Sequence, residues 1–197
     1  SLVLHGADAA RFRDVAEGLE RQVYPNWELI VVPSANTTIE PNIHPAVRIA
    51  PAPADNAAEA LAIAAAQAQG EFVLFLPAGA ALPPIALYRY AQALQDAPAA
   101  DVLYGDHDRI DAQGARSQPW FKPQWNAEMV LAQDTLSQAC ALRAAALRGV
   151  LPSAADLAPA ALYAAGRDLR DGGRVVRGTH VLPHRTADRP AQRAQAA

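Results

Sequence analysis

The chain has 197 residues, of which 51% are hydrophobic and 19% are charged, and its formal net charge at pH 7 is −3. The hydrophobic fraction can fill a substantial core and excludes a disordered polypeptide. The small negative charge gives no basic footprint for nucleic acid or an anionic membrane surface, so neither is expected as a partner. The single cysteine, Cys140, excludes an internal disulfide and a multi-cysteine zinc site.

Strands and helices are expected to alternate along the first half of the chain. Strands are predicted at 1–4, 27–32 and 47–49, and helices at 10–22 and from Asn56 to about Gln69. Asn56 and Glu59 have the spacing of a helix cap. A strand at 72–76 follows, and Pro83-Pro84 suits the first turn of a helix that runs to about Asp96. This alternation predicts a largely parallel sheet covered by helices on both faces.

The second half is expected to be mixed. A strand is predicted at 101–105, and the residues 111–114 have the composition of a hairpin turn that returns through 117–121. Four arginines near the end, at positions 167, 170, 174 and 177, alternate with aspartates and are interpreted as a solvated face. We expect one domain over residues 1–186, followed by a polar, frayed tail over 187–197.

No segment of the chain is predicted to span a membrane. The uncharged stretch 72–88 is interrupted by Gly79 and Pro83-Pro84 and is shorter than the roughly 20 apolar residues that a spanning helix needs. No signal peptide is visible, and the chain begins at Ser1 inside an expected strand, so an excised or processed domain is expected. We expect a cytoplasmic protein, which flanking segments could attach to the inner face of the membrane.

Six segments carry a resemblance that extends from Ser1 to about Arg185. They are residues 24–32 (YPNWELIVV), 70–76 (GEFVLFL), 100–111 (ADVLYGDHDRID), 114–116 (GAR), 120–126 (WFKPQWN) and 181–185 (VLPHR). In order and approximate spacing they resemble family 2 glycosyltransferases that build bacterial surface polysaccharides. The resemblance implies the GT-A fold of nucleotide-diphospho-sugar transferases, an α/β fold of three layers with a mainly parallel central sheet and a small antiparallel hairpin. It also implies a donor-side half over about 1–100 and an acceptor-side half over about 101–186.

The positions at which that family carries its functional carboxylates hold other residues here. Residues 31–36 (VVPSAN) lack the paired aspartates that follow the second strand, and Pro77 and Gly79 stand at the aspartates of the D-x-D motif. An ungapped comparison gives Ala160-Ala161 at the base position, and Asp156 is the one carboxylate nearby. Such carboxylates hold a divalent metal that neutralises the leaving diphosphate and take the proton of the acceptor hydroxyl. We therefore predict a degenerate domain with no cofactor.

Two functions stay open at this point. The favoured one is a non-catalytic module of glycan biosynthesis that recognises a glycan, or that orients a catalytic partner domain in a longer polypeptide. The alternative is an active inverting glycosyltransferase that uses a nucleotide-sugar donor, either without metal or with Mn²⁺ or Mg²⁺. Asp156 would then be the base, and Lys122 would offset the charge of the diphosphate.

Polar and aromatic residues persist on the acceptor side. A substrate or partner surface is predicted around Tyr104 with the following residues: Asp106, Asp108, Trp120, Lys122 and Trp125. Asp106, His107, Asp108 and Asp111 could also form a metal cluster, because alternate residues of a strand share a face. We favour a placement of these residues at a strand end and in the following turn, where they cap backbone groups or face water. Histidines 5, 44, 180 and 184 show no metal-ligand spacing and are expected to be solvated or hydrogen-bonded.

Overall fold

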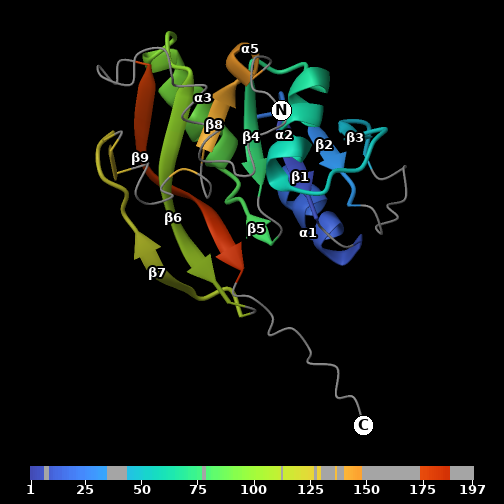
Figure 1. The fold of residues 1–197 in the computed structure, drawn as a ribbon. Coiled ribbons are helices and arrows are strands. Elements are labelled where there is room, and N and C mark those ends of the chain that lie inside the picture. The colour runs from blue at the N-terminus through green and yellow to red at the C-terminus, as the bar shows by residue number, and fades with distance from the viewer. Residues whose placement is uncertain are drawn as a thin grey trace.

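The structure, a computed structural model, describes residues 1–6, 9–34, 44–76, 79–111, 113–126, 128–129, 136, 140–147 and 174–186. Its strands form one sheet in the order β3-β2-β1-β4-β8-β6-β9-β5, and β7 pairs with β6 (Figure 1). The strands are β1 (Leu2–His5), β2 (Leu29–Val32), β3 (Val47–Ile49), β4 (Phe72–Leu76), β5 (Ala80–Ala81), β6 (Val102–Ile110), β7 (Arg116–Trp120), β8 (Cys140–Arg143) and β9 (Val175–Thr186). The helices are α1 (Ala9–Glu20), α2 (Ala57–Gln67), α3 (Ala86–Asp96) and α5 (Ala144–Leu147).

The sheet is mainly parallel. Strands β1, β2, β3 and β4 are joined by parallel pairings, and β6 and β9 are parallel to each other. Because β8 is antiparallel to both β4 and β6, these six strands all run in one direction. Strands β5, β7 and β8 run the opposite way. The predicted parallel sheet with a small antiparallel hairpin, here β6–β7, is confirmed.

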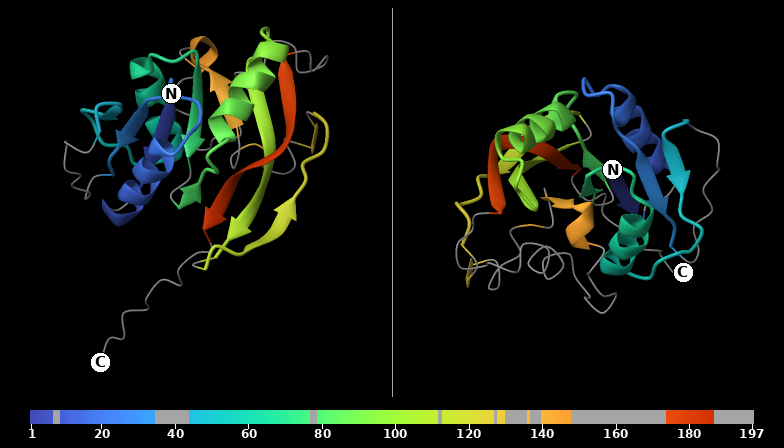
Figure 2. Two further views of the ribbon diagram at one scale, coloured as in Figure 1. Left: turned by 180° about the vertical axis from the view of Figure 1, so that it is seen from behind. Right: turned by 90° about the horizontal axis from the view of Figure 1, so that it is seen from above.

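Helices cover both faces of the sheet and give three layers (Figure 2). Helices α1 and α3 pack on one face, around Leu4, Phe12 and Leu103. Helices α2 and α5 pack on the other face, around Val3, Leu61 and Leu142. Successive residues of β1 contribute to opposite clusters, as expected for a strand whose side chains alternate between faces. No helix in the described part of the chain is long and apolar enough to cross a membrane.

The predicted cap of α2 is confirmed. The Asn56 side chain accepts a hydrogen bond from the Glu59 amide at 2.9 Å, and the Glu59 carboxylate accepts one from the Asp55 amide at 2.8 Å. Two orphan amides at the helix start are thereby satisfied. The helix ends at Gln67, earlier than predicted, because Ala68 has extended backbone angles.

The strand predicted at 101–105 is longer in the structure, where β6 extends through Ile110. It pairs with β9 along nearly its whole length and with β8 and β7 at its two ends. The hairpin turn after β6 is as predicted. The Asp111 carboxylate accepts hydrogen bonds at 2.9 Å from the amides of Gln113 and Ala115, and Gly114 has a φ of +82°, which suits glycine.

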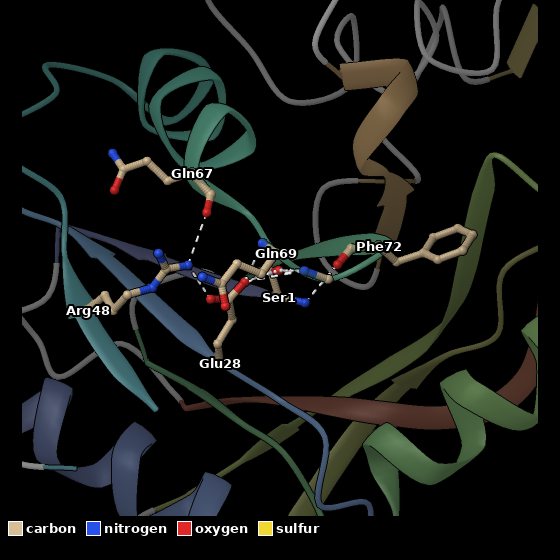
Figure 3. Close-up of polar contacts among 7 residues, drawn as sticks. Ser1, Glu28, Arg48, Gln67, Gln69 and Phe72 are labelled. Atoms are coloured by element: carbon tan, nitrogen blue, oxygen red, sulfur yellow. Dashed lines mark hydrogen bonds and ion pairs between the residues drawn. The ribbon is translucent and has the colours of Figure 1, made fainter. Parts of the chain in front are cut away.

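The parallel strands begin at one edge of the sheet, here called the amino edge, and a carboxylate ties several of them together there (Figure 3). Glu28 accepts hydrogen bonds from the Ser1 hydroxyl at 2.5 Å and the Gln69 amide at 2.7 Å, and it pairs with Arg48. Arg48 also donates to the Gln67 carbonyl at 3.0 Å. These contacts join the starts of β1 and β2 to β3 and to the connection between α2 and β4.

Candidate functional site

The parallel strands β1, β2 and β4 end together at the opposite edge, here called the carboxyl edge. Helix α1 connects β1 to β2 on one face, whereas α2 connects β3 to β4 on the other. The chain therefore moves away from β1 in both directions, and such a switch point at the carboxyl ends of strands is where open α/β sheets bind ligands. This edge is the expected place for a nucleotide-sugar donor.

The described residues just beyond these strands offer no carboxylate. Gly6 follows β1, Pro33 and Ser34 follow β2, and Gly79 stands between β4 and β5 with a φ of +87°. Proline and glycine have no side-chain atom that can bind a cation, and serine offers a neutral hydroxyl. Pro77 and Ala78, which the sequence comparison places in the D-x-D region, lie outside the described residues.

The protein itself covers part of this edge. The His5 ring nitrogen Nε2 lies 3.0 Å from the Ala54 carbonyl oxygen, and the Ala54 amide donates to the Pro33 carbonyl at 3.0 Å. Ala54 is 1% exposed. The segment before α2 is thus fastened over the ends of β1 and β2.

Asp106 lies inside β6 and is 2% exposed. Both of its carboxylate oxygens accept hydrogen bonds from the Arg177 guanidinium, at 3.0 and 3.1 Å. The same carboxylate also accepts from the backbone amide of Lys122 at 2.8 Å. Asp106 therefore joins β6 to β9 and to the segment after β7.

Asp108 is also 2% exposed, and its carboxylate contacts the side chains of Arg116 and His184. Its Oδ2 accepts from Arg116 Nε at 2.6 Å, and its Oδ1 lies 2.5 Å from His184 Nδ1. Arg116 belongs to β7 and His184 to β9, so the Asp108 side chain joins the three strands around it. The expected placement of Asp106 and Asp108 at a strand end or facing water is wrong, because the pairing of β6 with β9 buries both.

His107 and Trp120 pack together beside these carboxylates. Their ring centroids lie 5.1 Å apart in an edge-to-face arrangement. His107 is 5% exposed, and burial, together with the positive charges of Lys122 and Arg185, lowers the pKa of its imidazole to about 4. His107 is therefore neutral at physiological pH.

Tyr104 and Trp125 fix the segment that follows β7. The Tyr104 hydroxyl donates to the Pro123 carbonyl at 2.8 Å, and its ring centroid lies 6.5 Å from that of Trp125. Burial raises the pKa of Tyr104 to about 12. Trp125 packs against the core cluster on the α2 face of the sheet.

The predicted recognition residues are therefore brought together, but mostly in the interior. Tyr104, Asp106, Asp108 and Lys122 are each 2% exposed, so they do not form a free surface. Trp120 and Trp125 are half-buried. Substrate binding by these residues stays a prediction. Asp156 and Ala160-Ala161 lie outside the described residues, so the base position stays a prediction as well.

Three partners in this network were not predicted from the sequence: Arg116, Arg177 and His184. Arg177 was expected on a solvated face, which is wrong, because its side chain is 16% exposed and pairs with Asp106. The one available signal was the alternation of Asp106 and Asp108 in a strand-like segment, which places both on one face and requires nearby counter-charges if that face is buried.

The described residues do not fit the divalent metal that a nucleotide-sugar donor commonly brings. The carboxylate oxygens of Asp106 and Asp108 already have partners within the protein, namely Arg177 for Asp106, and Arg116 and His184 for Asp108. Within the described ranges, no group of three or more His, Cys, Asp or Glu side chains could hold a metal ion. Hard cations need several oxygen ligands, which the described residues of this site do not offer.

No protein-family model matches the chain. The chain is 33% identical over 142 residues to the O-antigen biosynthesis protein RfbC of Myxococcus xanthus, a match that covers 66% of this chain and 11% of that protein. It is 27% identical over 158 residues to the uncharacterized protein y4gI of Sinorhizobium fredii, which covers 75% of this chain and 17% of that protein. The chain thus spans less than a fifth of the length of either relative.

Solved structures share the fold. TarS residues 1–349 from S. aureus, in complex with UDP-GlcNAc, matches with a TM-score of 0.66 and 18% identity over 94% of this chain and 58% of that chain. The mannosyltransferase PcManGT from Pyrobaculum calidifontis, in complex with GDP-Man and Mn²⁺, matches with a TM-score of 0.61 and 17% identity. That match covers 97% of this chain and 57% of the mannosyltransferase chain. These matches, with the O-antigen relative, confirm the resemblance to surface-polysaccharide glycosyltransferases. The assignment to family 2 stays a prediction.

Proposed function

Because the chain has the GT-A fold of glycosyltransferases, we propose that it is a domain of surface-polysaccharide biosynthesis that does not itself transfer sugar. Its role is recognition of a glycan or nucleotide-sugar, or structural support of a catalytic domain. The O-antigen relative supports the biosynthetic setting. We place the domain in the cytoplasm, where nucleotide-sugars are made.

One observation carries this proposal: the described residues just beyond β1, β2 and β4 have no carboxylate, and the nearby Asp106 and Asp108 are neutralised within the sheet. A metal ion supplies several kcal/mol of charge stabilisation to a departing diphosphate. A general base contributes about 10²–10⁴-fold in rate. A domain without both contributions would retain little transferase activity.

The proposed partner is a catalytic domain of the same longer polypeptide. The relatives support it, because each is more than five times the length of the segment that this chain matches. A second GT-A domain with an intact D-x-D motif in the full-length protein would agree with this role.

Calorimetric titration of the purified chain with UDP and with GDP, each with Mn²⁺, tests the proposal. We expect no heat beyond that of dilution, because the described residues just beyond β1, β2 and β4 supply no carboxylate to hold the metal with the diphosphate. Micromolar affinity would overturn the proposal. In that event, Asp106→Asn and Asp108→Asn would show whether either carboxylate leaves its arginine to bind the metal.

A second candidate function, a metal-independent transferase, is favoured by the contact between Asp108 and His184. A carboxylate that holds one imidazole nitrogen leaves the other free to accept a proton, which is the arrangement of many general bases. Incubation with UDP-GlcNAc or GDP-mannose tests this candidate. Turnover lost in His184→Asn would assign the base to His184, whereas turnover lost in Asp156→Asn would assign it to Asp156.

A further inference from the structure

A cavity among the described residues lies far from the carboxyl edge. Its volume is about 540 Å³, within the range of about 300–1,000 Å³ that is typical of small-molecule sites. It opens at the amino edge, where α3 faces the starts of β1 and β4 and the end of β8. We propose that this cavity binds a neutral saccharide.

Aromatic side chains form part of the cavity wall. Tyr24, Trp27 and Phe72 line it. The Trp27 ring is stacked on His44, with centroids 5.1 Å apart and planes at 21°, and the Arg143 guanidinium lies 4.6 Å from the centroid of the Phe72 ring. Figure 3 shows the Phe72 ring extending away from the Glu28 contacts. These contacts hold the rings in place before a ligand binds, and flat apolar rings suit the C–H faces of a sugar.

Two carboxamides supply polar groups at the same cavity. Asn26 and Gln95 line it, both are exposed, and neither side chain has a hydrogen-bond partner within the described part of the chain. A carboxamide both donates and accepts hydrogen bonds. Sugar hydroxyls do the same, so the two side chains match a saccharide better than they match a purely apolar ligand.

The charges at the cavity favour an uncharged ligand. Three of its lining residues carry ionic groups. Glu71 and Arg143 pair with each other, Arg143 also lies 3.3 Å from Asp101, and the Ser1 ammonium donates to the Phe72 carbonyl at 2.7 Å. Each cation that lines the cavity thus already has a partner among the described residues, which disfavours a phosphate. The inference goes beyond the proposed function, because it concerns the opposite edge of the sheet and holds whether or not the carboxyl edge binds a donor.

Titration with defined sugars tests the inference. Methyl glycosides and homodisaccharides of glucose, galactose, mannose, rhamnose and N-acetylglucosamine are added to the purified chain, and binding is followed by tryptophan fluorescence and amide NMR. We expect at least one sugar to bind and to shift the amide signals of Tyr24, Asn26, Trp27 and residues 70–72.

Gln95→Ala and Asn26→Ala are each expected to weaken that binding about three- to tenfold, the value of one hydrogen bond. Gln92→Ala is the matched control, because Gln92 lies on the same helix, is also exposed and does not line the cavity. Its affinity is expected to be unchanged.

Three results would overturn the inference: no sugar binding at 10 mM, equal affinity in the two cavity variants and the control, or displacement of the sugar by UDP. The amide spectrum of each variant confirms that the fold is intact. The first two results do not depend on metal or diphosphate binding, so they separate this test from that of the proposed function.

Discussion

The two halves of the sheet use polar residues in different ways. In β1, β2 and β4 the side chains are almost entirely apolar, and the described residues beyond these strands carry no carboxylate. Strands β6 and β9 instead bury Asp106, Asp108 and His184 inside the sheet. Acidic residues in the segment 100–111 can therefore resemble those of a glycosyltransferase while they stabilise the fold, because carboxylates paired with neighbouring strands are not available to a cation.

The largest expected effect is at Asp106. Asp106→Asn removes the charge that balances Arg177, whose side chain is 16% exposed, and should lower the free energy of unfolding by about 3 kcal/mol. Urea unfolding at pH 7 measures it. Asp14→Asn, at an exposed position of α1, is the control and should change stability by less than about 0.5 kcal/mol. An Asp106→Asn variant that keeps its stability but loses binding of a glycan or nucleotide-sugar would contradict this view. Asp106 would then be a binding residue and not a structural one.

A pH dependence should arise from the same half of the sheet. The pKa of His107 is lowered to about 4, so the unfolded chain takes up a proton at higher pH than the folded chain does. The free energy of unfolding should therefore fall as the pH decreases from about 6.5 to about 4. Urea unfolding across this range measures the slope, and His107→Gln should reduce it. An NMR titration that places the His107 midpoint near 6.5 would contradict the prediction.

The first half of the fold could be predicted from the sequence because its signals are local. The strands β2, β3 and β4, the capped start of α2 and the turn at Asp111 each follow from neighbouring residues. The extent of β6 could not be predicted in this way. Its residues 106–109 are polar, and they form a strand because β9 pairs with this part of β6 from far along the chain.

The ion pairs of Asp106 and Asp108 could not be predicted from neighbouring residues either. Arg177 lies 71 residues after Asp106, and His184 lies 76 residues after Asp108. A sequence that alternates arginines with aspartates looks the same whether it is solvated or paired across a sheet. By contrast, the sequence itself shows that no acidic residue lies next to Pro33 or Gly79.

Glu28 provides the corresponding test in the first half, at the amino edge. Burial raises the pKa of Glu28, but the hydrogen bonds from Ser1, Gln69 and Arg48 lower it by more than burial raises it. The pKa of Glu28 therefore lies below its ordinary value of 4.5. The stabilisation is therefore present above pH 4.5 and is lost as the pH falls through the lowered pKa. Glu28→Gln should lower the free energy of unfolding by about 1–2 kcal/mol at pH 7 and flatten this acid dependence. If the free energy of unfolding of Glu28→Gln fell with decreasing pH as steeply as that of the original protein, the role of Glu28 would be contradicted.

The smallest expected effect is at Asn56, and it bears most directly on our proposal that the first half binds no donor. Asn56→Ala removes the cap of α2 and should cost about 1 kcal/mol, whereas Asn56→Asp keeps a capping oxygen and should cost much less. Asn56 also ends the segment that Ala54 fastens over β1 and β2 through His5 and Pro33. If the missing carboxylates are what prevents donor binding, loosening this segment should leave UDP and Mn²⁺ unbound in calorimetry. Binding gained in Asn56→Ala would instead mean that the covering segment excludes the donor, and the contrast between the two halves would then rest on access rather than on charge.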